Sequence, residues 1–182
     1  MAKHKYKIKL DILDNIDSEK KAYFLGFFYA DGYNNQTQGK LVIRLQARDK
    51  QILEEFSDIF FFERPKLYYI LNKTNGLKKS DSYTLCITSR KLSDKMGTLG
   101  APQCKSFFIR FPFWLDDDLL RFFIRGYFDG DGSCSRYKRK RNNVVSYQIC
   151  FACNEIFAKQ LKLVLNDLIN LNFKICKSGN IF

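Results

Sequence analysis

Residues 22–32 read Ala-Tyr-Phe-Leu-Gly-Phe-Phe-Tyr-Ala-Asp-Gly, and residues 122–132 read Phe-Phe-Ile-Arg-Gly-Tyr-Phe-Asp-Gly-Asp-Gly. A constant offset of 100 residues relates the shared positions: Gly26 and Gly126, Phe28 and Phe128, Asp31 and Asp131, Gly32 and Gly132. A match in register over a continuous segment indicates an internal duplication, which is the first feature to seek in a sequence. We therefore expect the 182-residue chain to fold as two related halves.

Each repeated segment is predicted to form a helix. Ser18 or Asp17 can cap the first helix, because a side-chain oxygen accepts hydrogen bonds from the free N–H groups of the first turn. The triplet 116–118, which is Asp-Asp-Asp, can do the same for the second helix. The Asp-Gly pair that ends each copy predicts a helix stop, with Gly32 and Gly132 in the left-handed conformation.

Small residues recur four positions apart in both predicted helices, at Gly26 and Ala30 and again at Gly126 and Gly130. Residues at i and i+4 share one helix face, and small side chains allow two helix backbones to approach closely. If the two helices pack on each other in pseudo-twofold fashion, their C-terminal ends lie side by side. Asp31 and Asp131 would then lie within a few ångströms of each other.

Two adjacent carboxylates repel each other unless a cation lies between them, and Mg²⁺ or Mn²⁺ prefers oxygen ligands of this kind. The backbone carbonyls of Ala30 and Gly130, at the helix C-termini, would add negative potential there. Asp31 and Asp131 are therefore candidate metal ligands for metal-assisted phosphodiester hydrolysis. The alternative is that both are only polar residues at helix ends.

The segments after each repeat predict an α+β fold built from helix–β–β–helix–β–β–helix units. In the first half we expect strands at 40–48, 66–71 and 83–88 and helices at 50–60 and 89–96. In the second half we expect strands at 133–141 and 144–152, a turn at Asn142-Asn143, a helix at 155–170 and the start of a strand at 172–175. The predicted division is a first half at 1–100, a linker at 101–117 and a second half at 118–182.

The formal net charge of +12 favours a polyanionic partner, because cationic side chains that neutralise phosphates release condensed counterions. Alternation in 40–48 places polar and basic side chains on one strand face. Arginine suits guanine and glutamine suits adenine in the major groove, whereas most of the basic run at 136–141 would contact phosphate. The candidate DNA-binding residues are Lys40, Arg44, Gln46, Arg48, Arg136, Lys138, Arg139, Lys140 and Arg141.

The sequence also limits where the protein works. It has no run of about 18 apolar residues, so no membrane span is expected. It has no apolar signal segment, and its six scattered cysteines suggest reduced thiols in an intracellular protein of the cytoplasm, nucleoid or an organelle matrix. Cys150 and Cys153 form its one CxxC, which fits packing residues on a strand better than a zinc site.

The repeated segments resemble a known motif. Phe24–Gly32 and Ile124–Gly132 resemble the LAGLIDADG motif of homing endonucleases, and the resemblance extends over roughly residues 14–175. It implies a two-motif, single-chain enzyme in which the motif helices form the interface between two αββαββα halves. It also implies that the last acid of each motif, Asp31 and Asp131, binds divalent metal, and that the strands form saddle-shaped sheets over the DNA major groove. Activity of this kind serves intron or intein mobility.

Two positions depart from the family pattern or extend it. Tyr29 stands where many members carry another acid, at a position that is usually not the metal ligand. A basic residue near the fourth strand often assists catalysis in the family, and Lys91 is the nearest candidate here. The alternative for Lys91 is a solvated helix lysine.

The second half is shorter than the first. In the first half, 65 residues follow Asp31 up to Met96, whereas in the second half only 51 residues follow Asp131 up to Phe182. We expect its fourth strand and last helix to be largely missing, DNA affinity to be reduced, and cleavage to be weak or lost. A monomer is expected, with a dimer or a complementing chain as alternatives. The competing functional hypothesis is a DNA- or RNA-binding protein of the same fold without cleavage, such as a maturase or a regulator.

Overall fold

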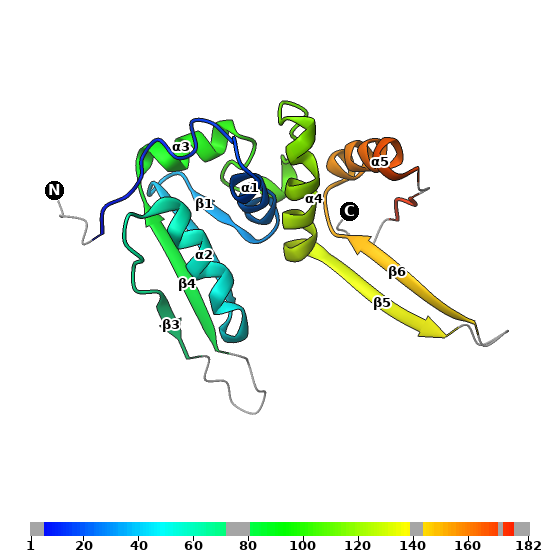
Figure 1. Ribbon diagram of the computed structural model, residues 1–182, viewed down its shortest axis with the longest axis horizontal. Helices are drawn as coiled ribbons and strands as arrows, with labels where there is room; N and C mark the ends of the chain where they lie inside the picture. The colour runs from blue at the N-terminus through cyan, green and yellow to red at the C-terminus, as the bar shows by residue number, and fades with distance from the viewer. Residues whose placement is uncertain (1–5, 72–80, 139–143, 171–172, 177–182) are drawn as a thin grey trace.

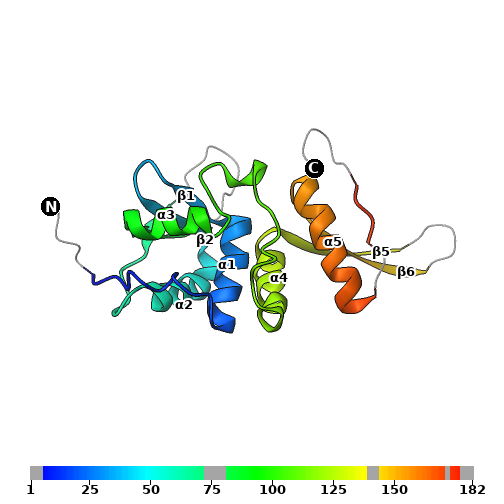
Figure 2. The ribbon, with the colours of Figure 1, turned by 90° about the horizontal axis from the view of Figure 1, so that it is seen from above.

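A computed structural model describes residues 6–71, 81–138, 144–170 and 173–176. Two long helices, α1 (Glu19–Asp31) and α4 (Asp117–Asp131), lie side by side at its centre, and the two sheets lie on opposite sides of this pair (Figures 1 and 2). The predicted packing of an α+β fold through its motif helices is confirmed. Within the described ranges, no helix combines the length and the apolar character needed to cross a bilayer.

The first half completes the predicted αββαββα unit. After α1 come β1 (Tyr33–Asn35), β2 (Lys40–Gln46), a 3-10 turn η1 (Ala47–Asp49), α2 (Lys50–Phe60), β3 (Tyr68–Ile70), β4 (Ser82–Thr88) and α3 (Arg90–Thr98). The strands form one antiparallel sheet in the order β1-β2-β4-β3. Ser18 caps α1 by accepting a hydrogen bond from the Lys21 N–H, and Ser89 caps α3 through the Leu92 N–H.

Alternation in β2 places Leu41 and Ile43 in the core under α2 and leaves Arg44 and Gln46 exposed. The strand was predicted to run to Arg48, and this was wrong by two residues. The Ala47 N–H donates to the carbonyl of Asp81 at 2.8 Å, and the chain then turns through η1 into α2.

The described part of the second half contains α4, β5 (Gly132–Lys138), β6 (Val145–Phe151) and α5 (Glu155–Ile169). The two strands form an antiparallel sheet, and Asn154 caps α5 by accepting from the Phe157 N–H at 2.9 Å. The turn predicted at Asn142-Asn143 lies outside the described residues. The strand expected to begin at 172–175 is not formed by the described residues 173–176.

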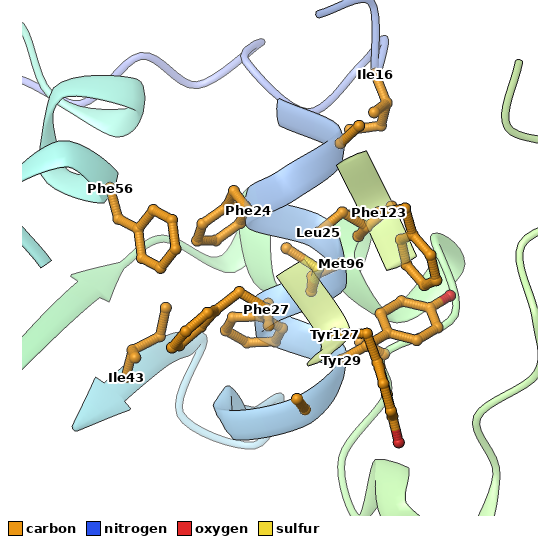
Figure 3. Close-up of a cluster of buried hydrophobic side chains, with 14 of the residues drawn as sticks. Ile16, Phe24, Leu25, Phe27, Tyr29, Ile43, Phe56, Met96, Phe123 and Tyr127 are labelled. Atoms are coloured by element: carbon orange, nitrogen blue, oxygen red, sulfur yellow. The ribbon is translucent and has the colours of Figure 1, made fainter. Parts of the chain in front are cut away.

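Aromatic side chains on both sides of α1 join the halves into one core (Figure 3). On one side, Phe24 meets Phe56 of α2 edge to face at 5.0 Å between ring centroids. On the other side, Tyr29 packs edge to face on Phe123 of α4 at 5.1 Å. Because edge-to-face rings are a favourable arrangement, α1 is held from both sides and positions the residues at its C-terminal end.

The central helices touch backbone to backbone. A Cβ added at Gly26 would lie 1.9 Å from the Phe123 carbonyl oxygen, and one added at Gly126 would lie 2.1 Å from the Tyr23 carbonyl oxygen. A Cβ added at Gly130 would lie 2.4 Å from the Ala30 Cβ. These three approaches show that α1 and α4 run in the same direction with their C-terminal ends together.

The reason for glycine at the two helix ends differs from the prediction. Gly32 and Gly132 are extended rather than left-handed, with φ of −73° and −89°. A Cβ added at Gly32 would lie 2.3 Å from the ring of Phe28, and one at Gly132 would lie 2.2 Å from the ring of Phe128. Each glycine is therefore required because an aromatic ring one turn earlier covers the helix exit.

Candidate metal and nucleic-acid site

Asp31 and Asp131 are the last residues of α1 and α4 and lie at the meeting point of the helix ends. One carboxylate oxygen of Asp31 would be 3.6 Å from a Cβ added at Gly130, so the Asp31 side chain lies against the end of the other helix. Burial raises the pKa of both carboxyls, and the charge of Asp131 raises the pKa of Asp31 further. The two acids therefore belong to one electrostatic site.

A lysine that sequence analysis did not select also lies at this site. Lys105 begins a 3-10 turn, η2 (Lys105–Phe107), and is only 8% exposed. Its ammonium group donates to the carbonyl oxygens of Tyr29 at 2.7 Å and Ala30 at 2.5 Å. Its charge lowers the pKa of both Asp31 and Asp131, which opposes the effect of burial on the two acids.

Burial lowers the pKa of Lys105 itself, whereas Asp131 and Asp31 raise it. The available sequence signal was weak, because Lys105 is a single lysine in front of the apolar run Phe107–Ile109 in the linker. Only tertiary packing, which folds the linker back against the end of α1, distinguishes it from a surface lysine.

Lys91, the candidate named from the sequence, occupies a different environment. It lies exposed in the first turn of α3, where its ammonium group contacts the carboxylate of Asp11 and lies 3.7 Å from a carboxylate oxygen of Asp14. These contacts join it to the N-terminal segment. Lys105 is the lysine that the structure brings to the acid pair.

Tyr29 and Asp129, which lie two positions before the acids in the two motifs, make hydrogen bonds that fix the motif helices in place. Tyr29 is buried and donates its hydroxyl hydrogen bond to the Leu99 carbonyl at 2.5 Å. Its counterpart Asp129 accepts from the Tyr23 hydroxyl at 2.8 Å, across the interface between α1 and α4. Burial first, and then this bond, raise the pKa of Tyr23 above its ordinary value. Both positions are engaged in packing contacts.

The donor set at the helix ends fits a hard divalent cation. Mg²⁺ commonly binds one or two carboxylates and completes its shell with water and substrate phosphate oxygens. Asp31 and Asp131 would supply the carboxylates, and the Gly130 carbonyl is a candidate backbone donor at the end of α4. Among the described residues no cluster of three His, Cys, Asp or Glu is placed to hold a metal ion. Burial raises the pKa of the nearby Cys153 thiol to about 11, so it is protonated at neutral pH.

A polar sheet surface flanks the acids in the first half. On the face of β2 turned away from α2, Arg44 is exposed and donates to the Thr84 hydroxyl at 3.2 Å, and Gln46 is exposed beside it. Lys40 donates to the Gln38 side chain at 2.9 Å. Arg48 lies in η1, beyond the strand, with its guanidinium 3.5 Å from Asp49. Two exposed tyrosines on this face, Tyr33 and Tyr68, were not selected from the sequence.

The register of β5 with β6 separates the polar residues of the second half onto two faces. Ser135 pairs with Gln148 and Tyr137 with Ser146, so these side chains share one face with Ser133. Ser133 is the duplicate of Tyr33, so this polar face corresponds to the open face of the first sheet.

Arg136 and Lys138 project from the other face of this hairpin, opposite Tyr147 and Val145. That face also carries Phe151, which packs against Phe128. The remaining predicted contacts, Arg139, Lys140 and Arg141, lie outside the described residues.

Comparison with known protein families finds a match in the second half of the chain. Residues 118–179 match the family model described as the LAGLIDADG-like domain. The match begins in α4 and continues past α5, so this part of the chain is similar to a LAGLIDADG-like domain. No curated protein matches the chain significantly.

Proposed function

We propose that this chain is a site-specific endonuclease that hydrolyses phosphodiester bonds of double-stranded DNA with divalent metal ions. The observation that carries the proposal is the convergence of Asp31 and Asp131 at the adjoining ends of α1 and α4, between two sheets. The net charge of +12 supports a phosphate-bearing partner. Cleavage at a defined site would serve the mobility of an intron or an intein.

The chain's own residues have separable roles in this mechanism. A divalent ion bound between the acids would lower the pKa of a water molecule and stabilise charge on the leaving oxygen. Asp31 and Asp131 would hold that ion, and the Gly130 carbonyl would be a further donor. The glycine contacts between α1 and α4 keep the two carboxylates close together. Lys105 adds a positive charge beside them, where anionic phosphate must enter.

Sequence recognition is proposed to come from the open faces of the two sheets. Arg44 and Gln46 reach toward base edges from the first sheet, because their side chains match the acceptor and donor patterns of guanine and adenine. Tyr137 and Gln148 occupy the corresponding face of the second hairpin. Arg136 and Lys138, on its other face, are restricted to phosphate contacts beside the groove.

The proposal is tested by selecting DNA and then asking whether it is cut. Duplexes bound by the protein are enriched from a randomised library in Ca²⁺, and the enriched site is placed in a supercoiled plasmid. We expect cutting or nicking of this plasmid in Mg²⁺ or Mn²⁺ and none in EDTA. Specific binding without cleavage would reject the endonuclease and favour a DNA-binding regulator or maturase of the same fold.

A further inference from the structure

The two sides of the acid pair differ in one respect that the duplication does not predict. Ala30 and Gly130 are equivalent positions, and each could offer a helix-terminal carbonyl to a cation. The Ala30 carbonyl already accepts a hydrogen bond from the buried Lys105 ammonium at 2.5 Å. A metal ion cannot use the same oxygen in the same direction while the ammonium group is in place.

We propose that Lys105 is a resident cation of the acid pair, which takes the place of a metal ion on the α1 side. This inference rests on the proposed function. The Lys105 ammonium group would limit the site to one divalent ion, held by Asp131, the Gly130 carbonyl and Asp31. Lys105 is a positioning residue here, because it acts through the Ala30 carbonyl and the acid charges.

The burial of Lys105 supports this role over that of an ordinary surface lysine. Removing a lysine from water costs free energy unless the charge is paired and hydrogen-bonded. Hydrogen bonds to two backbone carbonyls and the charges of Asp131 and Asp31 offset part of that cost. In return, the ammonium group offsets the repulsion between Asp31 and Asp131 in the metal-free protein. The acid pair is therefore assembled before a metal ion binds.

A purely structural role is the competing explanation, since Lys105 also joins the linker to the end of α1. The two explanations differ in what metal binding does. If Lys105 only joins the linker, its removal destabilises the fold and leaves the number of bound ions unchanged. If it replaces a metal ion, its removal opens a second cation position, and added metal restores stability.

Lys105→Met tests this, because methionine keeps an unbranched stem and removes the charge. Lys21→Met is the matched control. Lys21 also donates to a backbone carbonyl, that of Asn15 at 3.0 Å, and also pairs with a carboxylate, that of Asp17 at 2.8 Å. Lys21 lies in the first turn of α1, about 15 Å along the helix axis from Asp31. Bound Mn²⁺ is counted by electron paramagnetic resonance, and thermal melting is followed in EDTA and in saturating Mn²⁺.

We expect one bound Mn²⁺ for the wild type and for Lys21→Met, and two for Lys105→Met. In EDTA, Lys105→Met should melt about 10 °C below the wild type, since unpairing buried charges is strongly destabilising, and Mn²⁺ should recover most of that loss. The Lys21→Met loss should be smaller and independent of Mn²⁺. An unchanged ion count in Lys105→Met, or a melting loss that Mn²⁺ does not reduce, would overturn the inference.

The wild-type measurement alone keeps the inference testable if Lys105→Met does not fold. Two or more bound Mn²⁺ per wild-type chain would overturn the resident-cation role and leave the proposed endonuclease standing. No bound Mn²⁺ in either protein would overturn both proposals. The failure of the inference and the failure of the proposed function are thus distinguishable.

Discussion

Replacement of Gly126 by alanine should separate the two central helices. The added Cβ would lie 2.1 Å from the Tyr23 carbonyl oxygen and 2.9 Å from both the Phe27 nitrogen and the Tyr23 carbonyl carbon. Real Cβ atoms essentially never come within 3.0 Å of such atoms, so the backbones must part by at least 0.9 Å, the difference between 3.0 and 2.1 Å. All three neighbours are backbone atoms of α1, so no side-chain rotation relieves the contact.

The expected loss of stability follows from two opposing effects. Over-packing of this size costs about 3 kcal/mol, and the higher helix propensity of alanine returns about 1 kcal/mol. We therefore expect Gly126→Ala to lower the free energy of unfolding by about 2 kcal/mol and the melting temperature by about 4–8 °C. Urea unfolding and thermal denaturation, both followed by circular dichroism, measure the two quantities.

Gly97→Ala is the matched control within a helix. A Cβ there would meet the end of the Gln36 side chain, with its amide nitrogen at 2.6 Å, and a flexible side chain can move away. We expect Gly97→Ala to change stability by less than about 1 kcal/mol. A Gly126→Ala protein that melts within about 1 °C of the wild type, or no lower than Gly97→Ala, would refute the close approach of α1 and α4.

Two further predictions concern DNA binding and pH. Arg44→Ala should weaken binding to the selected site by about 1–3 kcal/mol and relax its base preference, as measured by fluorescence anisotropy. Arg64→Ala is the control: it removes a guanidinium paired with Asp58 at 2.6 Å and should leave DNA binding unchanged. Equal losses of affinity in both variants would contradict the role of Arg44. In EDTA at neutral pH, Asp131→Asn should be more stable than the wild type, because burial raises the pKa of Asp131 and its ionised form therefore destabilises the native state. This gain in stability should disappear as the pH falls through the raised pKa of Asp131 toward the usual value of 3.8. Urea unfolding at several pH values measures the gain. A gain that does not change with pH would contradict the prediction.

The duplicated segments made the fold predictable because one local pattern carried both helix formation and helix packing. The stripe of Gly26 and Ala30, with Gly126, specified which helix faces meet, and α2 was predicted with the bounds it has in the structure. The three-residue strand β1 was not placed, since so short a segment has no hydrophobic periodicity to detect.

The candidate site was predictable only where the repeat marked it. Asp31 and Asp131 share a position in both copies, and that is a sequence signal. Lys105 has no counterpart in the repeat and reaches the acids through tertiary folding of the linker, which no local pattern encodes. The face of β6 that holds Gln148 likewise depends on its register with β5, which the sequence left undetermined.

The most direct test of the central claim compares the wild type with the double variant Asp31→Asn, Asp131→Asn on the selected duplex. Binding is measured in Ca²⁺ and cleavage in Mg²⁺, with the same protein preparations. We predict equal affinities, cleavage by the wild type and no cleavage by the variant. Cleavage by the variant at the wild-type rate would contradict the assignment of these two acids as the metal-binding pair.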